Sequence, residues 1–252
     1  IVGGLTPACT DAAVELYRSC VDTLVPVSSA DAAELTKLLE NIFRSVNIAL
    51  VNELAMLCHR MGLDVWEVVD AAATKPYGFM PFRPGPGLGG HCLPIDPFYL
   101  SWRAREYDFT TEFIELAGKV NQAMPYHCAE RVAHALNGVR KPVAGSRVLV
   151  VGVAYKSDVG DLRESPALKL MELLSAEGAD VGYHDPHVPA LVHGPFELRS
   201  EPLTDELLEA VDIVCVVTAH RAVDHDRLAD RAALVLDFRN VVPRERGNVV
   251  VL

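Results

Sequence analysis

The chain has 252 residues, of which 50% are hydrophobic and 23% are charged, and its formal net charge at pH 7 is -11. This composition is typical of a globular protein with enough apolar residues for one or two hydrophobic cores. The acidic balance disfavours nucleic acids and anionic membrane surfaces as partners, and no apolar run reaches the roughly 18 residues of a membrane-spanning helix.

Residues 1–28 contain a short apolar start, a predicted helix over residues 11–22 and the extended stretch TLVPVS. A piece this short cannot bury a hydrophobic core of its own. We therefore expect it to be the remnant of a preceding domain.

A long helix is predicted over residues 31–60, because apolar residues recur there at steps of three and four. It would be about 45 Å long at 1.5 Å per residue. Ser28 or Ser29 is the expected N-cap, and Gly62 is the expected C-cap. The apolar residues of the pattern are Leu35, Leu38, Leu39, Ile42, Phe43, Val46, Leu50, Leu54 and Leu57.

Further helices are predicted on both sides of a proline- and glycine-rich stretch. LDVWEVVDAAAT and PFYLSWRAREY predict short helices, and residues 111–137 predict a longer one that Pro125 should kink or break. Residues 76–97 also carry aromatic side chains, which predicts an ordered loop rather than a flexible linker.

From residue 146 the pattern changes to alternating strands and helices. RVLVVGVAY, ADVGYHDP, VDIVCVVTAH and ALVLDFRN predict strands, and residues 166–177 and 204–210 predict helices. This alternation is typical of a doubly wound parallel sheet. We therefore predict an α/β fold, in which a helical central domain over residues 29–140 precedes a Rossmann-like domain over residues 141–252.

The six cysteines are scattered and form no C-x-x-C pair. A disulfide-stabilised domain would be smaller and richer in cysteine, so we expect reduced thiols and a cytoplasmic protein. A metal site is not expected, because the histidines and paired aspartates lack ligand spacing. These residues are His184, His187, His220, His225, Asp224 and Asp226.

Cys92 is the first candidate for chemistry. It follows the glycine-rich stretch GPGLGGH, in which the glycines allow backbone conformations and close approaches that a Cβ would block. A reactive thiol needs a lowered pKa or a nearby base, and His91 and Asp96 are close in sequence. The alternative is an inert thiol that behaves as a small hydrophobic residue, as most free cysteines do.

Charged and amide side chains form a second group of candidates. Lys37 and Asn41 lie one turn apart on the long helix, off its leucine face, and Arg44 continues the same line. They are either a solvated surface or groups directed at developing negative charge on an oxygen.

The strand–loop–helix unit after residue 146 has only Gly152 where a dinucleotide-binding turn needs three glycines. Lys156, Arg163 and Arg239 follow predicted strands. They are either surface residues or ligands for a phosphate at the carboxyl edge of the sheet.

Three segments in order resemble the UDP-glucose/GDP-mannose dehydrogenase family, the nucleotide-sugar 6-dehydrogenases. They are AELTKLLENIFRSVNIALVNELA, PGPGLGGHCLPIDPFYL and GVAYKSDVGDLRESPALKLMELL. The histidine before the cysteine and the PIDP after it resemble the UDP-N-acetylhexosamine branch, and KPYGFMPFRPGPGLGGHC is most similar to UDP-N-acetylglucosamine 6-dehydrogenases.

The resemblance implies oxidation of the sugar C6 alcohol to a carboxylate by two hydride transfers to NAD⁺. Cys92 would trap the intermediate aldehyde, Lys37 would stabilise the oxyanion, Asn41 would position the oxygen or a water, and Asp96 would assist water activation. A homodimer through the long helix is implied as well. Residues at family positions for substrate contact are Arg44, Tyr77, Arg83, Gly89, Lys156, Arg163 and Arg239.

The chain departs from the family pattern because no N-terminal G-x-G-x-x-G domain is present. NAD⁺ is therefore expected to bind mostly outside these residues, and this chain alone is expected to be inactive. Three alternatives remain open: a nucleotide-sugar-binding module without catalysis, a relative specific for UDP-N-acetylmannosamine or UDP-glucose, and a cysteine-dependent hydrolase or transferase that uses Cys92 and His91.

Overall fold

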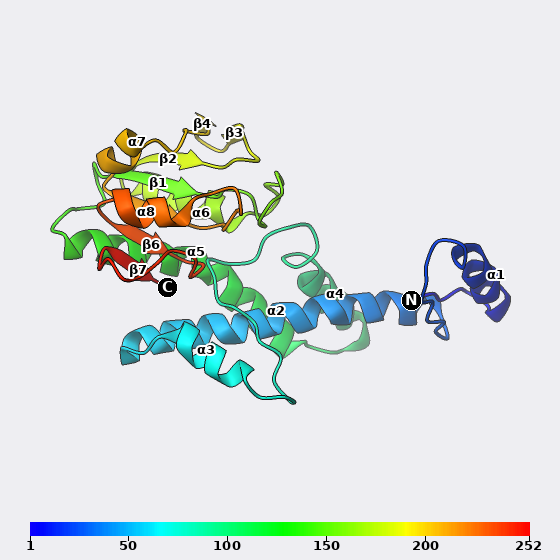
Figure 1. Ribbon diagram of the computed structural model, residues 1–252. Helices are drawn as coiled ribbons and strands as arrows, with labels where there is room; N and C mark the ends of the chain where they lie inside the picture. Colours follow the sequence, from blue (N-terminus) through cyan, green and yellow to red (C-terminus); the bar gives the residue numbers. More distant parts are fainter.

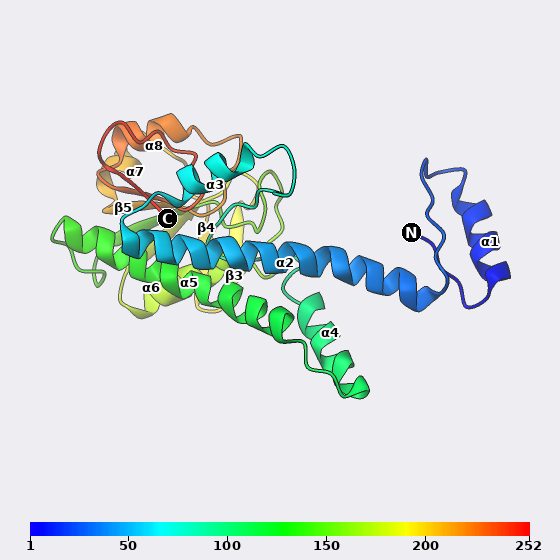
Figure 2. The same ribbon diagram turned by 90° about the horizontal axis from the view of Figure 1, so that it is seen from below.

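The computed structural model describes all residues, 1–252, as a helical part joined to a sheet part, with a small N-terminal segment at one end. Figures 1 and 2 show this segment beyond the first turn of the long helix α2, away from the sheet. The predicted α/β fold with a long central helix is confirmed. None of the helices is both long and apolar enough to cross a membrane.

Helix α1 spans Pro7–Tyr17, so the predicted range 11–22 was wrong at both ends. The helix starts earlier because the Thr6 hydroxyl accepts a hydrogen bond from the backbone N–H of Cys9 at 3.2 Å and Pro7 occupies the first turn. Thr10 is the one buried residue of α1.

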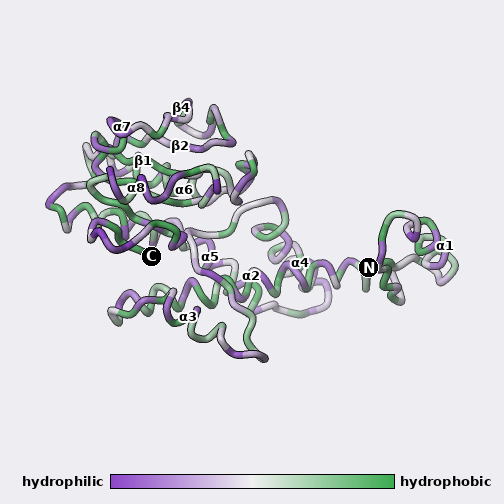
Figure 3. The backbone as a smooth tube through the Cα atoms, in the orientation of Figure 1, coloured by the Kyte–Doolittle hydropathy of each residue, from purple (hydrophilic) through white to green (hydrophobic).

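Helix α2 spans Ala30–Met61, as predicted. The Ser29 hydroxyl accepts a hydrogen bond from the backbone N–H of Ala32 at 3.1 Å, and Gly62 ends the helix in the left-handed conformation at φ 70°. The side that packs on α5 is partly polar, because Asn41, Ser45 and Asn52 are buried there. Figure 3 accordingly shows hydrophilic and hydrophobic residues interspersed along α2.

The remaining helices of this part are α3 (Val65–Ala73), α4 (Asp96–Ala104), the single turn η1 (Arg105–Tyr107) and α5 (Glu112–Gly138). The prediction was that Pro125 kinks or breaks this helix, and α5 continues through Pro125 without a break. Proline leaves the carbonyl of the residue four positions earlier, Asn121, without its helical donor. That carbonyl faces Gly87 of the glycine-rich loop, where a Cβ would lie 3.4 Å from the oxygen.

The second part contains a five-stranded parallel sheet in the order β2-β1-β5-β6-β7. Its strands are β1 (Arg147–Val151), β2 (Asp180–His184), β5 (Ile213–Val216), β6 (Val235–Asp237) and β7 (Val249–Val251). A separate hairpin is formed by β3 (Ala190–His193) and β4 (Phe196–Arg199). The helices are α6 (Pro166–Ala176), α7 (Asp205–Ala210) and α8 (His225–Arg231).

The hydrophobic core is divided by the sheet into two layers. Val148 and Val150 of β1 face a large cluster that includes residues of α5 and α6, whereas Leu149 and Val151 face a smaller cluster with α7 and α8. Because the larger cluster also contains residues of α2 and α3, α5 belongs to the cores of both parts. The domain boundaries at residues 28 and 140 therefore stay a prediction.

A chain of buried amides connects α2, α5 and the glycine-rich loop. The side-chain N–H of Asn121 donates to the backbone carbonyl of Ser45 at 3.0 Å, and the side-chain N–H of Asn52 donates to the amide oxygen of Asn121 at 3.0 Å. The amide oxygen of Asn52 accepts from the backbone N–H of Gly85 at 2.9 Å. Since Asn52 and Asn121 are 0% and 4% exposed, water does not compete for these hydrogen bonds.

Replacing Asn121 with leucine should destabilise the chain by about 1–3 kcal/mol, because the Asn52 amide and the Ser45 carbonyl would each lose a buried partner. Urea unfolding followed by circular dichroism measures this free energy. The matched control is Asn47→Leu, which removes a half-exposed amide that contacts only Phe43 of its own helix. Equal effects of the two substitutions would contradict the importance of the buried chain.

The buried Arg131 connects the last strand to the helices. Arg131 of α5 donates to the His59 Nε2 atom at 2.8 Å and to the Val251 carbonyl at 2.9 Å. Burial and the neighbouring Arg131 charge lower the pKa of His59, and burial followed by Arg131 lowers that of His127. Protonation of both imidazoles is therefore less favourable in the folded chain than in the unfolded chain.

The unfolded chain takes up protons at these histidines near pH 6.5, whereas the folded chain takes them up only at lower pH. The free energy of unfolding should therefore fall as the pH drops below about 6.5. Urea unfolding at pH 7.5 and pH 5.5 measures the loss. In His59→Gln the loss between the two pH values should be smaller than in the unmodified chain. An unchanged loss would show that His59 does not contribute.

Candidate active site

The glycine-rich loop that precedes Cys92 lies between the helical part and the sheet part. At its start, the Gly85 N–H donates to Asn52 of α2, as described above. Near its end, the Gly90 N–H donates to the Arg163 carbonyl at 2.8 Å, in the loop between β1 and α6. The loop is thereby fixed to both parts of the molecule.

The glycines of this loop are required by contacts within the protein itself. A Cβ at Gly89 would lie 2.6 Å from the Tyr155 Cβ and 2.8 Å from the Glu164 carbonyl oxygen. Gly90 has φ 92°, and a Cβ there would lie 2.9 Å from the Tyr155 ring. Tyr155 therefore fills the space beside Gly89 and Gly90, and the contact of Gly89 with the substrate stays a prediction.

Cys92 begins the turn over residues 92–95 that leads into α4, which we call the thiol turn. Its carbonyl accepts hydrogen bonds from the N–H groups of Ile95 and Asp96 at 3.1 and 2.8 Å, which fixes the backbone of the turn. The thiol is exposed, and its Sγ atom lies 3.7 Å from the His91 Nδ1 atom. In contrast, Cys58, Cys128 and Cys215 are buried, and burial raises the pKa of Cys215 to about 12.

Asn41 and Asp96, which are 55 positions apart in the sequence, meet beside this turn. The Asn41 amide N–H donates to the Asp96 carboxylate at 2.7 Å, and Asn41 is only 3% exposed. Since Asp96 opens α4 and its N–H donates to the Cys92 carbonyl, the hydrogen bond positions the thiol turn against α2. Three of the predicted catalytic residues are therefore brought together.

Lys37 and Arg44 lie one turn before and nearly one turn after Asn41 on α2. The Lys37 ammonium pairs with Glu40 at 3.2 Å, and both side chains are exposed. Such an exposed pair contributes little to stability, so Lys37 can exchange Glu40 for another anion. Arg44 is exposed and forms no ion pair.

The three candidate cations of the sheet part differ in their exposure and in the groups that they contact. Lys156 is exposed in the β1–α6 loop without an ion pair, whereas Arg163 is held by Asp161 at 2.6 Å. The Arg239 Nε atom donates to the Val217 carbonyl at 2.6 Å, and desolvation lowers the pKa of this guanidinium. Its guanidinium lies against Gly85, where a Cβ would be 2.5 Å from Nη1.

No hydrogen bond or ion pair connects Tyr77 or Arg83 with the turn that contains Cys92. Tyr77 is 84% exposed. Arg83 pairs with Asp70 of α3 and lies 5.9 Å from the centre of the Trp66 ring. Both contacts of Arg83 are to α3, and the substrate roles of Tyr77 and Arg83 stay predictions.

A pocket of about 620 Å³ adjoins the site between α4, α5 and α6. Leu93 and Pro94 of the thiol turn, Arg163 and Lys169 line it together with the glycine-rich loop. Cys92 and Asn41 are not among its lining residues, so the pocket lies next to the predicted catalytic residues rather than at them.

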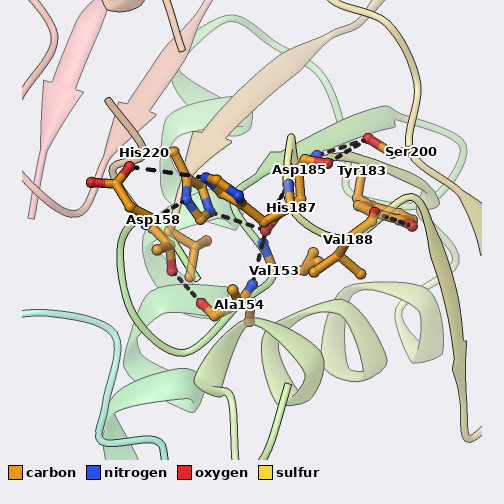
Figure 4. Close-up of polar contacts among 12 residues, drawn as sticks. Val153, Ala154, Asp158, Tyr183, Asp185, His187, Val188, Ser200 and His220 are labelled. Carbon is orange, nitrogen blue, oxygen red and sulfur yellow. Dashed lines mark hydrogen bonds and ion pairs between the residues drawn. The ribbon is translucent and has the colours of Figure 1, made fainter. Parts of the chain in front are cut away.

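The carboxyl edge of the sheet brings two of the histidines that were weighed as metal ligands, His187 and His220, together with Asp158, which was not considered. The ligand atoms of Asp158, His187 and His220 lie within 4.8 Å of one another. However, both ring nitrogens of His220 are already hydrogen-bonded, to the backbone N–H of Asp158 and to the Asp185 carboxylate, each at 3.0 Å. His220 therefore has no free lone pair for a metal. Figure 4 shows this arrangement.

The turn after β1 does not fit a dinucleotide. Gly152 has φ 84°, and the space beside its Cα is filled by Thr218 rather than open to a phosphate. The carboxylate just after β2, that of Asp185, is 1% exposed and accepts hydrogen bonds from the backbone N–H groups of Val153 and Ala154 in the loop after β1. The position that would hold a ribose in a dinucleotide site is therefore occupied by the protein's own backbone.

Comparison with known proteins identifies both parts of the chain. Residues 31–123 match the central domain of the UDP-glucose/GDP-mannose dehydrogenase family, and residues 149–244 match the UDP binding domain of the same family. The NDP-N-acetyl-D-galactosaminuronic acid dehydrogenase of Ralstonia solanacearum is 36% identical over 98% of this chain and 56% of its own length. The UDP-N-acetyl-D-mannosamine dehydrogenase of Methanococcus maripaludis is 32% identical over 99% of this chain and 56% of its own length.

Solved structures lead to the same result. The UDP-D-ManNAc dehydrogenase of Pyrococcus horikoshii superposes with a TM-score of 0.85 at 31% identity and covers 99% of this chain and 58% of that one. The NDP-N-acetyl-D-galactosaminuronic acid dehydrogenase of Methanosarcina mazei also gives 0.85 at 31% identity. The chain spans 56% of the length of the Ralstonia solanacearum and Methanococcus maripaludis relatives. It belongs to the UDP-glucose/GDP-mannose dehydrogenase family.

Proposed function

We propose that this chain supplies the catalytic cysteine and the nucleotide-sugar site of an NAD-dependent 6-dehydrogenase that acts on a UDP-linked N-acetylhexosamine. The observation that carries the proposal is the convergence of an exposed thiol, Cys92, with the Asn41–Asp96 pair at the junction of the two parts. Both parts match domains of a nucleotide-sugar dehydrogenase family. A cytoplasmic location belongs to the same proposal.

The chemistry that we assign to these residues takes place at sulfur. The Cys92 thiolate adds to the C6 aldehyde carbon, forming a C–S bond while the carbonyl electron pair moves to the oxygen. Lys37, whose exposed pair with Glu40 is readily exchanged, stabilises that oxyanion. Loss of a hydride from this adduct to NAD⁺, the oxidant implied by the family, would give the thioester. Water then adds to the thioester carbonyl carbon, Asp96 accepts one proton of this water, and the C–S bond breaks to leave the Cys92 thiolate and a carboxylic acid, which releases the second proton to solvent as it becomes the carboxylate.

The Asn41–Asp96 hydrogen bond assigns Asn41 a positioning role in this scheme. The amide N–H is directed at the Asp96 carboxylate at 2.7 Å, which leaves the second carboxylate oxygen for a water molecule. We assign NAD⁺ as the oxidant from family membership and not from a site in this chain, because the β1–α6 turn does not fit a dinucleotide. We therefore expect the chain to bind the sugar nucleotide and to bind NAD⁺ hardly at all.

For the substrate, the sequence analysis predicted UDP-N-acetylglucosamine. The relatives named above are NDP-N-acetyl-D-galactosaminuronic acid and UDP-N-acetyl-D-mannosamine dehydrogenases. Both names refer to N-acetylated amino sugars, which supports the predicted N-acetylhexosamine class over UDP-glucose. UDP-N-acetylglucosamine remains our first choice, with the manno and galacto epimers as alternatives. Lys156, Arg239 and Arg44 are the proposed partners of the diphosphate and sugar, with Arg163 and the Gly89 backbone beside them.

A UDP-N-acetylhexosamine should slow alkylation of Cys92 by about tenfold at ten times its dissociation constant, because the bound sugar covers the thiol. Peptide mapping after brief treatment with iodoacetamide measures each cysteine separately. Cys9 and Cys20, which are also exposed, serve as internal controls and should not be protected. Equal protection of all three, or of none by any sugar nucleotide, would contradict the proposal.

Calorimetry of the same chain with UDP-N-acetylglucosamine, the manno and galacto epimers, UDP-glucose, UDP and NAD⁺ then ranks the ligands. Lys156→Ala should weaken UDP binding about tenfold by removing a charged hydrogen bond. The matched control is Lys141→Ala, which removes a lysine that precedes the amino end of β1, whereas Lys156 follows its carboxyl end. This control should leave binding unchanged. Strong binding of NAD⁺ with no binding of UDP would reject the assignment.

The long helix is also the proposed interface of a homodimer. Leu35, Leu39, Phe43, Leu50, Leu57 and Met61 of α2 are between 47% and 64% exposed. At 100° per residue these six lie within about 80° of one another, and together they form an apolar stripe along one side of the helix. Since α5 packs on the other side, a second copy of α2 can cover the stripe.

Leu50→Glu should convert a dimer to a monomer, because it places a charge in the middle of the stripe. Analytical ultracentrifugation measures the mass. The control is Val192→Glu, which places the same charge on an 81% exposed valine of β3, far from α2 in the sequence. A monomeric unmodified chain, or a Leu50→Glu dimer, would refute the interface.

A further inference from the structure

A fully buried carboxylate–imidazole pair lies at the carboxyl edge of the sheet, outside the proposed catalytic residues. Asp185 follows β2 and His220 follows β5, the two strands that flank β1, and the Nε2 and Oδ2 atoms are 3.0 Å apart. The two side chains are completely buried. Figure 4 shows both side chains beside the segment that follows β1.

The Asp185 carboxylate holds the start of the β1–α6 loop. Its Oδ2 atom accepts hydrogen bonds from the N–H groups of Val153 and Ala154 at 2.8 and 3.0 Å, and its Oδ1 atom accepts from the N–H of His187 at 2.8 Å. Burial by itself would raise the pKa of Asp185, but the hydrogen bonds from His220, Ala154 and His187 lower it to about 2. The carboxylate is thus ionised and acts only as an acceptor.

His220 holds the other end of the same segment. The backbone N–H of Asp158 donates to the His220 Nδ1 atom at 3.0 Å, so the ring proton resides on Nε2 and is donated to Asp185. Asp158 itself has φ 62°, the left-handed conformation, and its carboxylate accepts hydrogen bonds from the backbone N–H and the side chain of Arg221. Residues 153–158 are therefore clamped at both ends by one buried pair.

The clamped segment carries two side chains of the proposed site. Tyr155 fills the space beside Gly89 and Gly90, immediately before the thiol turn. Lys156 is exposed and without an ion pair, as the proposed ligand of the diphosphate requires. A shift of this segment would move the cation and the support of the glycine-rich loop together.

We propose that Asp185 and His220 are positioning residues, which hold residues 153–158 in the conformation that presents Lys156 to the nucleotide diphosphate and Tyr155 to the glycine-rich loop. They act through the backbone and do not contact the substrate. The proposal rests on the proposed function for the identity of the ligand. The hydrogen bonds from Val153, Ala154 and Asp158 to the buried pair fix the segment whatever its ligand is.

Three substitutions test the pair. His220→Ala removes both hydrogen bonds. His220→Asn keeps an acceptor where Nδ1 stood and so conserves the bond from the Asp158 N–H. The matched control is Asn248→Ala, which removes two hydrogen bonds from a side chain to backbone carbonyls, those of Ala229 and Ala232 at 3.0 and 2.8 Å, at another place in the same sheet part.

Two measurements are made on each variant of the whole chain: amide hydrogen exchange of residues 153–158, and the dissociation constant of UDP by calorimetry. His220→Ala should raise exchange in this segment and weaken UDP binding about tenfold. His220→Asn should restore binding to within about threefold of the unmodified chain. Asn248→Ala should lower the unfolding midpoint without changing either quantity.

The outcomes separate this proposal from the proposed function. If His220→Ala leaves exchange of residues 153–158 unchanged, or raises it without weakening UDP binding, the positioning role is overturned. The same holds if Asn248→Ala weakens binding as much, since the effect would then be general destabilisation. If the unmodified chain binds no UDP ligand while His220→Ala still raises exchange, the proposed function is rejected, and so is the nucleotide as the ligand of this segment. The pair would then still fix residues 153–158.

Discussion

The structure depends on one constraint, the pairing of buried amides between α2, α5 and the glycine-rich loop. Asn52 and Asn121 are enclosed by apolar side chains, so each of their polar atoms needs a partner inside the protein. The partners present are the Ser45 carbonyl, the other amide and the Gly85 N–H. Because the last of these belongs to the loop, satisfying the helix pair also fixes where the loop begins.

From that starting point the loop crosses to the sheet part and ends at the thiol. Arg239 lies against Gly85, Tyr155 lies against Gly89 and Gly90, and the Arg163 carbonyl accepts the N–H of Gly90. The Asn41–Asp96 hydrogen bond then holds the turn after Cys92 against α2. The exposed thiol is therefore placed by contacts from both parts, whereas Cys128 and Cys215 are kept protonated by burial.

Helix α2 buries polar residues among the apolar ones of its packed face and leaves a row of apolar residues exposed on the other face. Its buried face carries Asn41, Ser45 and Asn52, and its exposed face carries leucines and a phenylalanine. The polar face can be buried because the amide chain satisfies it, and the apolar face is left for a second copy in the proposed dimer. The apolar periodicity of the sequence therefore predicted the helix correctly but corresponds largely to its exposed side.

The sequence by itself determined the elements whose signals are local. The caps at Ser29 and Gly62 defined α2, the β-branched runs defined β1 and β5, and the family motifs identified Cys92, Asn41 and Asp96 as candidates. Local signals were too weak for β3, β4, β7 and α8, which are short and have few buried residues. Only the tertiary structure decided that Pro125 is accommodated within α5, that Tyr155 is the neighbour of Gly89 and Gly90, and that Asp185 and His220 clamp the β1–α6 loop. These features depend on contacts between residues far apart in the chain, and neither spacing nor composition encodes such contacts.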